Sequence, residues 1–214
     1  MMKRSPDEER WNASTHLIGA CLAAVGLIWM CFRVSGNWQS PSAVACVVYA
    51  FLLVLMYTMS TLSHWFDDET NLNRFRALDQ ACIFLLITGT YTPFSVHYWN
   101  TSVANGLLFA MWCISIAGFV AKLYFSHRVN QISIVGYIVL GWMPILGLPF
   151  HKHWPTDAMC WVLAGGIVYT LGTIFLLNDQ KAKWCHPVWH LSVMAASAIH
   201  FAAVVSFVML DQAV

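Results

Sequence analysis

The chain has 214 residues, of which 59% are apolar and only 10% carry a charged side chain. This composition excludes an ordinary soluble domain and indicates an integral membrane protein. The 11 Lys and Arg nearly balance the 10 Asp and Glu, so the net charge of +1 provides no electrostatic attraction for nucleic acid. The nine His residues are nearly as numerous as either charge. Each His inside a membrane span therefore needs a structural or functional reason.

Seven apolar runs predict seven membrane-spanning helices, because each run is close to the roughly 20 residues that cross a bilayer. In chain order the runs span residues 15–34, 41–64, 79–99, 103–125, 131–150, 157–177 and 187–210. They predict an all-α integral membrane fold, a seven-transmembrane helix bundle. We expect a short cytoplasmic N-terminal segment, residues 1–14, followed by a single membrane domain, residues 15–211.

The distribution of cationic residues predicts the orientation of this bundle. Nine of them fall on one side and two on the other: Lys3, Arg4, Arg10, Arg74, Arg76, Lys122, Arg128, Lys181 and Lys183 against Arg33 and Lys152. By the positive-inside rule, the N-terminus is cytoplasmic and the C-terminus lies outside. We therefore expect a multi-pass protein of the cell (inner) membrane. This orientation argues against a G-protein-coupled receptor, and the seventh run holds no Lys for a retinal Schiff base.

Proline residues predict breaks in two of the runs. Pro93 interrupts the third run, and Pro144 and Pro149 interrupt the fifth. A kink with locally freed carbonyls is expected at each, where neighbouring helices or hydroxyl groups must satisfy the backbone. For the fifth run we favour a simple packing kink. For the third run a functional role is equally open, because Thr and Tyr residues cluster around Pro93.

Two pairs of polar residues with helical spacing carry the first chemical signal. His186 and His190 are four residues apart in the seventh run, and Ser60 and His64 have the same spacing in the second run. Residues at i and i+4 share one helix face. Two imidazoles in this arrangement can bind one metal ion, as they do in zinc sites built on a helix.

The predicted topology brings further groups to the same depth. His64, Asp79, His186 and His190 all lie near the cytoplasmic boundary of their runs. Three neutral imidazoles suit Zn²⁺ and leave a fourth position for water, and a carboxylate can hydrogen-bond that water or take its proton. Such an open site is typical of catalytic zinc, whereas structural zinc is usually enclosed by four protein ligands.

The remaining histidines have other expected roles. Four of them lie in or beside loops, where we expect interfacial residues: His97, His127, His151 and His153. His16 opens the first run on the cytoplasmic side, either as support for the metal ligands or only as an N-terminal polar residue. His200 follows His186 by fourteen residues, which is about 20 Å along a helix axis. It cannot share that metal, and we expect it to hydrogen-bond inside the bundle or to mark a cavity.

At these residues the chain resembles the hemolysin III family, the bacterial branch of the progestin and adipoQ receptor family, over nearly its whole length. The motifs are Glu9-x-x-Asn12-x-x-Thr15-His16-x-x-Gly19, Ser60-x-x-x-His64, Leu78-Asp79 with Gly89-Thr90-Tyr91-Thr92-Pro93-Phe94, and His186-Pro187-Val188-Trp189-His190 with His200-Phe201. The resemblance implies a zinc ion held by His64, His186 and His190. It also implies that Asp79 and Ser60 hold the zinc-bound water or a ligand carbonyl. Gln80 and Pro187 depart from the common pattern without removing a proposed ligand.

Together these features favour a zinc-dependent hydrolase of lipid amides or esters that acts in membrane lipid homeostasis. Asp79 is the expected general base and then acid, and Ser60 is expected to hydrogen-bond the water or the substrate carbonyl. Ceramide-like amides fit the family resemblance, whereas the sequence itself names no substrate. Membrane lipids are the expected substrate or ligand, no nucleic acid or protein partner is identifiable, and homo-oligomerisation stays open.

Other functions remain as alternatives. A non-enzymatic sensor or regulator of membrane state would use zinc as a structural link between helices two and seven. A hemolysin-type cytolysin is suggested only by the family name and is disfavoured, because the runs are uniformly apolar without a polar face. A transporter is also disfavoured, because no pair of charged or broken segments suggests an inverted repeat.

Overall fold

The computed structural model describes residues 6–98, 101–125, 130–150 and 154–211. The elements in chain order are α1 (Pro6–Val34), α2 (Pro41–Trp65), α3 (Glu69–Tyr98), α4 (Ser102–Phe125), α5 (Asn130–Trp142), the 3₁₀ segment η2 (Met143–Phe150), α6 (Thr156–Leu177), α7 (Cys185–Val204) and the π-helical segment η3 (Val205–Met209). Within those described ranges there is no strand. The predicted all-α fold is therefore confirmed.

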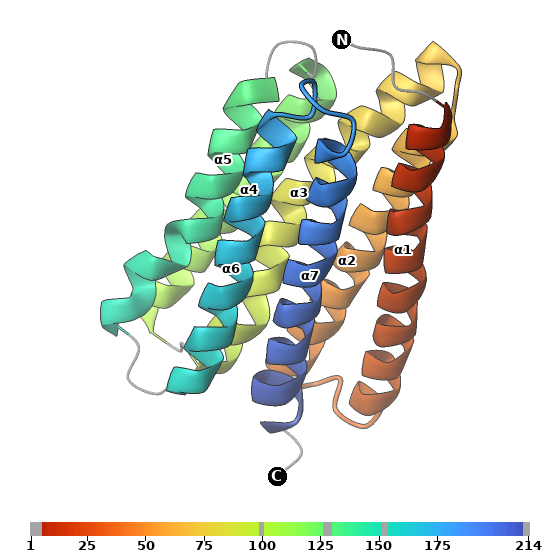
Figure 1. The fold of residues 1–214 in the computed structure, drawn as a ribbon. Helices are drawn as coiled ribbons and strands as arrows, with labels where there is room; N and C mark the ends of the chain where they lie inside the picture. The colour runs from red at the N-terminus through yellow and green to blue at the C-terminus, as the bar shows by residue number, and fades with distance from the viewer. Residues whose placement is uncertain (1–5, 99–100, 126–129, 151–153, 212–214) are drawn as a thin grey trace.

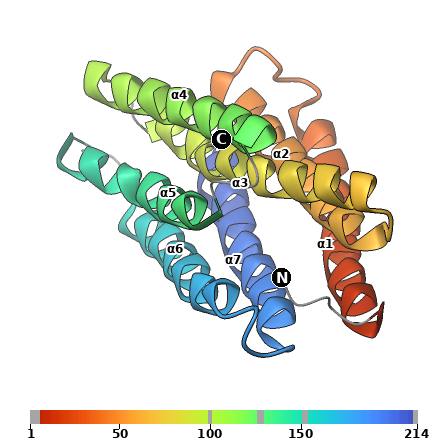
Figure 2. The same cartoon turned by 90° about the horizontal axis from the view of Figure 1, so that it is seen from above.

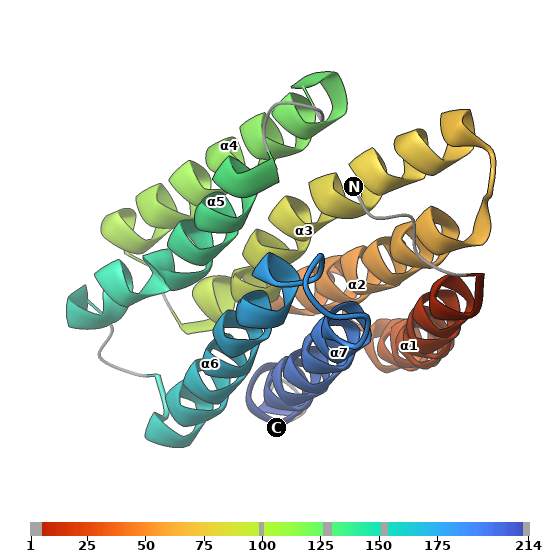
Figure 3. The same cartoon turned by 45° about the horizontal axis from the view of Figure 1, so that its top comes forward.

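The seven α-helices run alternately up and down the bundle (Figure 1). As a result, α1, α3 and α7 begin at the end of the bundle where α2 finishes. Viewed from above, α7 lies between α6 and α1, with α2 and α3 on its inner side (Figure 2). The tilted view shows α4 and α5 beyond α3, on the side away from α1 (Figure 3). This arrangement brings the start of α7 close to α1 and α2.

Five of these helices are long and apolar enough to cross a membrane, namely α1, α2, α4, α6 and α7 with η3. The α5–η2 segment contributes a shorter apolar stretch, Ser133–Gly147. Helix α3 begins with charged residues and carries the Thr-rich stretch around Pro93, which lowers its hydropathy. The structure thus supports a multi-pass membrane protein, and the count of seven spans stays a prediction.

Side-chain caps begin three of the helices. Ser40, Asp68 and Thr101 each accept a hydrogen bond from the backbone N–H three residues further on, at 3.3, 2.9 and 3.2 Å. Such caps satisfy an N–H that has no partner within the helix. Pro41 follows Ser40 as the first residue of α2, where its missing N–H has no cost. The hydrogen bonds from Asn71 also lower the pKa of Asp68, which lies in the polar connection before α3.

Two helices extend well beyond the apolar runs that predicted them. Helix α1 begins at Pro6 and α3 begins at Glu69, whereas the runs began at residues 15 and 79. The predicted boundary between segments 1–14 and 15–211 therefore falls inside a continuous helix. A run of apolar residues marks only the part of a helix that lies within the bilayer. A polar extension of the same helix therefore leaves no hydropathy signal.

The proline residues act differently in the two runs. Helix α5 changes to a 3₁₀ helix at Met143, immediately before Pro144, as expected for a residue that cannot donate to the helical ladder. Helix α3 instead continues through Pro93. There the hydroxyls of Thr90 and Thr92 donate to backbone carbonyls four residues earlier, at 2.8 and 2.7 Å. The predicted break is therefore confirmed in the fifth run, while Pro93 does not end its helix.

Burial differs among the spanning helices. In α2, 56% of the apolar window lies inside the protein, compared with 17% in α4 and in α6. Apolar side chains on the outer face of a membrane bundle contact lipid instead of protein. Helix α2 therefore forms part of the interior, and α4 and α6 present most of their surface outward.

Candidate metal centre

Three histidines meet at the end of the bundle where α2 finishes and α7 begins. Nε2 of His186 lies 3.2 Å from Nε2 of His64 and 3.0 Å from Nε2 of His190. One ring nitrogen from each of the three residues lies within 4.8 Å of the others. His190 is 1% exposed and His64 is 7% exposed. The structure therefore brings together the three predicted ligands as a cluster that could hold a metal ion.

Local helix geometry explains how the cluster forms. His186 and His190 lie in the first turns of α7, one above the other. Pro187, between them, is in the first turn, where a missing N–H breaks no helical hydrogen bond. His64 is the second-last residue of α2. Because these helices are antiparallel neighbours, the last turn of α2 faces the first turns of α7.

The outer nitrogen of each imidazole has a polar neighbour. Nδ1 of His64 lies 2.5 Å from Glu9 Oε2, and Nδ1 of His190 lies 3.2 Å from Thr15 Oγ1. Nδ1 of His186 lies 3.6 Å from Asp179 Oδ2. Glu9 and Thr15 belong to α1, and Asp179 follows the end of α6. Such partners commonly fix the ring orientation of metal-binding histidines in proteins.

The identity of these partners determines where the ring protons lie. An ionised carboxylate can only accept, so the hydrogen bond to Glu9 places the proton of His64 on Nδ1. The negative charge of Asp179, 3.6 Å from Nδ1 of His186, favours the same tautomer there. The hydroxyl of Thr15 donates to the carbonyl of Asn12 at 2.8 Å and therefore accepts from Nδ1 of His190. In each neutral ring the Nε2 atom then presents a lone pair. Three lone pairs thus converge on one point.

This donor set fits a bound cation. Three converging lone pairs repel one another, and a metal ion removes that repulsion by binding all three. Tetrahedral zinc with Zn–N bonds of 2.0–2.1 Å places its nitrogen ligands about 3.3–3.4 Å apart, close to the observed separations of 3.0 and 3.2 Å. Imidazole also suits copper, nickel and iron. The geometry therefore supports a metal site without fixing which metal it takes.

Glu9, Thr15 and Asp179 were not among the residues predicted to take part in the site. Glu9 and Thr15 do lie in the opening motif, and the three-residue steps from Glu9 through Asn12 to Thr15 place these residues near one face of α1. This spacing is the sequence feature that could have indicated that Glu9 and Thr15 face the site together. Glu9 also accepts from Arg76 of α3 at 3.4 Å, which extends the polar network. For Asp179, in the connection after α6, no motif or spacing was available.

Ser60 lies beside the histidine cluster rather than in it. Its hydroxyl is 2.6 Å from Nδ1 of His16, and the His16 ring stacks on the His190 ring with centroids 3.7 Å apart. His16 is buried. Of the two roles expected for His16, the structure therefore supports the one in which it backs the metal ligands.

Asp79 lies close to the same site from α3. Its Oδ2 accepts a hydrogen bond from Ser63 at 3.2 Å, and Ser63 precedes His64 in α2. Asp79, Ser60, His186 and His190 all line one cavity. The predicted catalytic pair and two of the three predicted ligands thus face a common space.

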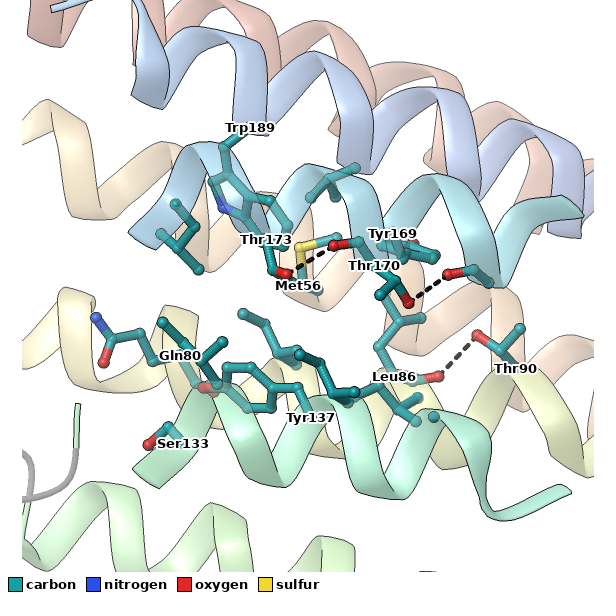
Figure 4. A pocket seen from close by; sticks show the side chains of 18 of the residues that line it. Met56, Gln80, Leu86, Thr90, Ser133, Tyr137, Tyr169, Thr170, Thr173 and Trp189 are labelled. Atoms are coloured by element: carbon teal, nitrogen blue, oxygen red, sulfur yellow. Dashed lines mark hydrogen bonds between the residues drawn. The ribbon is translucent and has the colours of Figure 1, made fainter. Parts of the chain in front are cut away.

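The cavity extends from the histidine cluster into the bundle and has a volume of about 620 Å³. Figure 4 shows Tyr137 of α5 on one wall, with Thr173 of α6 and Trp189 of α7 on the opposite side. Its threonine hydroxyls are engaged by their own helices: Thr170 and Thr173 donate to backbone carbonyls of α6 at 2.8 and 2.7 Å. The walls therefore present mainly apolar surface, which suits a hydrocarbon chain.

The other predicted histidines lie away from the cluster. His97 hydrogen-bonds Asp211 at 2.9 Å near the end of α3, consistent with an interfacial residue. His127, His151 and His153 lie outside the described residues. His200 hydrogen-bonds the backbone carbonyl of Val162 at 3.0 Å and lines the cavity, so both parts of its prediction are confirmed.

Known proteins with similar sequences cover nearly the whole chain. The chain is 36% identical over 203 residues to Hemolysin-3 of Bacillus cereus, covering 94% of this chain and 92% of that protein. It is 29% identical over 201 residues to the Hemolysin-3 homolog of Bacillus subtilis (strain 168), covering 94% of both proteins. The human monocyte to macrophage differentiation factor is 24% identical over 203 residues, with 92% of this chain and 83% of that protein covered.

No solved structure matches the chain. The family model described as Haemolysin-III related matches residues 5–201, a range that includes each of the motifs and all three histidines of the cluster. The resemblance inferred from those motifs is therefore confirmed, and the chain belongs to the hemolysin III family.

Proposed function

We propose that the protein is a zinc-dependent hydrolase of lipid amides or esters that acts in membrane lipid homeostasis. The observation that carries this proposal is the convergence of three Nε2 lone pairs beside a largely apolar cavity. A carboxyl group and a hydroxyl group, from Asp79 and Ser60, line the same cavity. A lipid carbonyl can therefore meet a metal, a base and a hydrogen-bond donor while its chain stays in an apolar environment.

We further propose seven membrane spans with the histidine cluster at the cytoplasmic face. Support comes from the described cationic residues, six of which lie toward the end of the bundle that holds the cluster: Arg10, Arg74, Arg76, Lys122, Lys181 and Lys183. Among the cationic residues that the structure describes, only Arg33, at the end of α1, lies toward the opposite end. The positive-inside rule then assigns the cluster to the cytoplasmic leaflet of the cell membrane.

Three residues would hold the metal through Nε2: His64, His186 and His190. When bound, zinc supplies a Lewis acid that polarises a carbonyl and lowers the pKa of water to about 7. Glu9, Thr15 and Asp179 keep the three rings in the orientation that directs Nε2 inward. This orientation is fixed before substrate arrives, so it costs no reorganisation during the reaction.

Asp79 is placed to move a proton. Its Oδ2, held by Ser63, would accept the proton of the attacking water and then deliver it to the leaving amine or alcohol. Ser60 would hydrogen-bond the substrate carbonyl, with its hydroxyl oriented by Nδ1 of His16. These roles need both groups on the cavity wall, which is where the structure has them.

The direct test is turnover by purified, zinc-loaded protein in nanodiscs, with ceramide and a lipid ester as substrates. We expect Asp79→Asn to lower kcat by at least about a hundredfold, the usual contribution of a positioned acid–base, while the metal content stays unchanged. Asp67→Asn, in the connection between α2 and α3, is the matched control and should keep full activity. If the zinc-loaded protein cleaves neither lipid class, the hydrolase proposal is wrong.

A second candidate is a non-enzymatic sensor with structural zinc. The observation that favours it is that the cluster and its partners join three helices, because Glu9 of α1, His64 of α2 and His186 of α7 belong to one network. Metal removal separates the candidates. A large fall in thermal stability without turnover under any condition would support the sensor. A bound metal whose water is displaced by hydroxamate-type inhibitors, together with turnover, would support the enzyme.

A further inference from the structure

The end of the cavity nearest the histidine cluster is polar, in contrast to its deeper walls. Two residues of α3, one in the first turn of α5 and two in the connection after α6 line this end, which we call the cavity mouth: Asp79, Gln80, Ser133, Asp179 and Gln180. The deeper walls present mainly apolar surface. A lipid whose hydrocarbon chain fills the deeper part therefore has its polar end at the mouth.

The side-chain amide of Gln80 is open to a molecule bound in the mouth. The residue is half-buried and lines the cavity, and within the described ranges its amide makes no hydrogen bond and is not enclosed. Its backbone carbonyl instead accepts from the hydroxyl of Tyr137 at 2.7 Å. Figure 4 shows Gln80, Ser133 and Tyr137 on one side of the cavity and Trp189 on the opposite side. Gln80 thus offers one donor and one acceptor to a ligand.

The charged residues of the mouth are acidic. Asp79 and Asp179 line the cavity, and no Lys or Arg within the described ranges does. Arg76, four residues before Gln80, is not part of the lining and donates to Glu9 at 3.4 Å. A divalent ion at the histidine cluster would at most cancel the two carboxylates. The mouth therefore has no excess positive charge with which to hold an anionic group.

A phosphate and a hydroxyl make opposite demands on such a mouth. A phosphate that leaves water needs cationic partners, which proteins supply chiefly with Arg and Lys, and nearby carboxylates repel it. A hydroxyl carries no charge and both donates and accepts a hydrogen bond. The amide of Gln80 can therefore pair with a hydroxyl, whereas a phosphate meets two like charges.

We infer that the cavity mouth selects lipids whose polar end is an uncharged, hydroxyl-bearing group over lipids that carry phosphate there, and that Gln80 is a residue that determines this selectivity. Nε2 of Gln80 donates to the hydroxyl oxygen, or its Oε1 accepts from the hydroxyl. The inference rests on the proposed function, because that function places the lipid carbonyl at the cluster and the polar end of the lipid in the mouth. Selection by charge is a property that neither the three histidines nor the apolar walls provide.

Competition binding with two lipids that differ only in a phosphate tests this inference. Dioleoylglycerol and dioleoyl phosphatidic acid compete with a radiolabelled diacylglycerol for purified protein in phosphatidylcholine nanodiscs. An ionic strength of about 0.15 M screens the attraction of phosphatidic acid to exposed cations. We expect dioleoylglycerol to bind at least about tenfold more tightly, because the carboxylates repel the phosphate.

Substitution of Gln80 provides the second arm. Gln80→Lys puts a cation in the mouth, so the affinity for phosphatidic acid should rise at least about tenfold. Gln80→Leu removes the amide at similar size, so the affinity for dioleoylglycerol should fall about fivefold, which is the loss of one hydrogen bond. Gln39→Lys is the matched control, because Gln39 is exposed in the connection between α1 and α2 and does not line the cavity. It should keep the preference for dioleoylglycerol.

Equal affinity of the two lipids for the unsubstituted protein, or tighter binding of phosphatidic acid, would overturn the inference, and this comparison needs no variant. A folded Gln80→Lys protein with the same preference as Gln39→Lys would also overturn it, as would a Gln80→Leu protein with undiminished affinity for dioleoylglycerol. The proposed hydrolase is judged separately. Turnover without a preference between the two lipids contradicts only the selectivity of the mouth, and a preference without turnover contradicts only the hydrolase.

Discussion

His190 and His200 lie on the same helix and line the same cavity, and both are buried, yet their environments differ. Nδ1 of His190 is held by Thr15, and its Nε2 faces another imidazole nitrogen. His200 uses Nε2 on a backbone carbonyl and leaves Nδ1 toward no described partner. Burial alone therefore does not identify a metal ligand in a membrane bundle. The partner of the second ring nitrogen distinguishes His190, the proposed ligand, from His200.

The largest expected effect comes from removing one histidine of the cluster. His190→Ala should lower bound metal from about one ion per chain to almost none, because two imidazoles leave the open site with too few protein ligands. Metal analysis of purified protein measures this directly. His200→Ala should retain the metal, since His200 is about 15 Å from His190 along α7.

His97→Ala is the surface control for this pair and should also retain full metal content. If His190→Ala and His200→Ala lost metal equally, the contrast between the two histidines would be wrong.

A smaller effect is expected at the carboxylate that holds His64. Glu9→Gln keeps the shape of the side chain but weakens its acceptor, so the metal affinity should fall by about 10-fold to 100-fold, as usual for such partners. A chelator titration measures the change. Asp7→Asn is the control, because Asp7 lies in the first turn of the same helix and is exposed. An unchanged affinity in Glu9→Gln would show that Glu9 does not orient the ring.

The smallest effect concerns the close approach of His200 to α6. Gly165→Ala would put a Cβ 2.2 Å from His200 Nε2, and accommodating it should cost about 1–3 kcal/mol of stability. The adjacent Gly166→Ala meets nothing nearer than Trp142 at 4.0 Å and should be neutral or slightly stabilising. Thermal unfolding in detergent compares the two variants, and both should keep their metal. Equal melting temperatures would contradict the packing of His200 against α6.

Much of the fold could be predicted because hydropathy reports the part of each helix within the bilayer. The bounds of α2, α4 and α6 differ from the predicted runs by one residue or none. The early starts of α1 and α3 could not be predicted this way, since their polar first turns resemble loop sequence. The change from α to 3₁₀ helix before Pro144 followed from proline chemistry.

The metal ligands could be predicted, and their supporting residues could not. Spacing placed His186 and His190 on one helix face, and topology brought His64 to the same depth. Thr15 and Asp179 meet these rings only after α1 and the end of α6 pack against α7. Such contacts between distant segments leave no local pattern in a single sequence.

The most direct test of the metal centre is X-ray absorption at the zinc edge on the purified, metal-loaded protein. We predict about one zinc ion per chain with three imidazole nitrogens at about 2.0–2.1 Å and one further light-atom ligand. A shell with sulfur ligands, or with fewer than three imidazoles, would contradict the site formed by His64, His186 and His190.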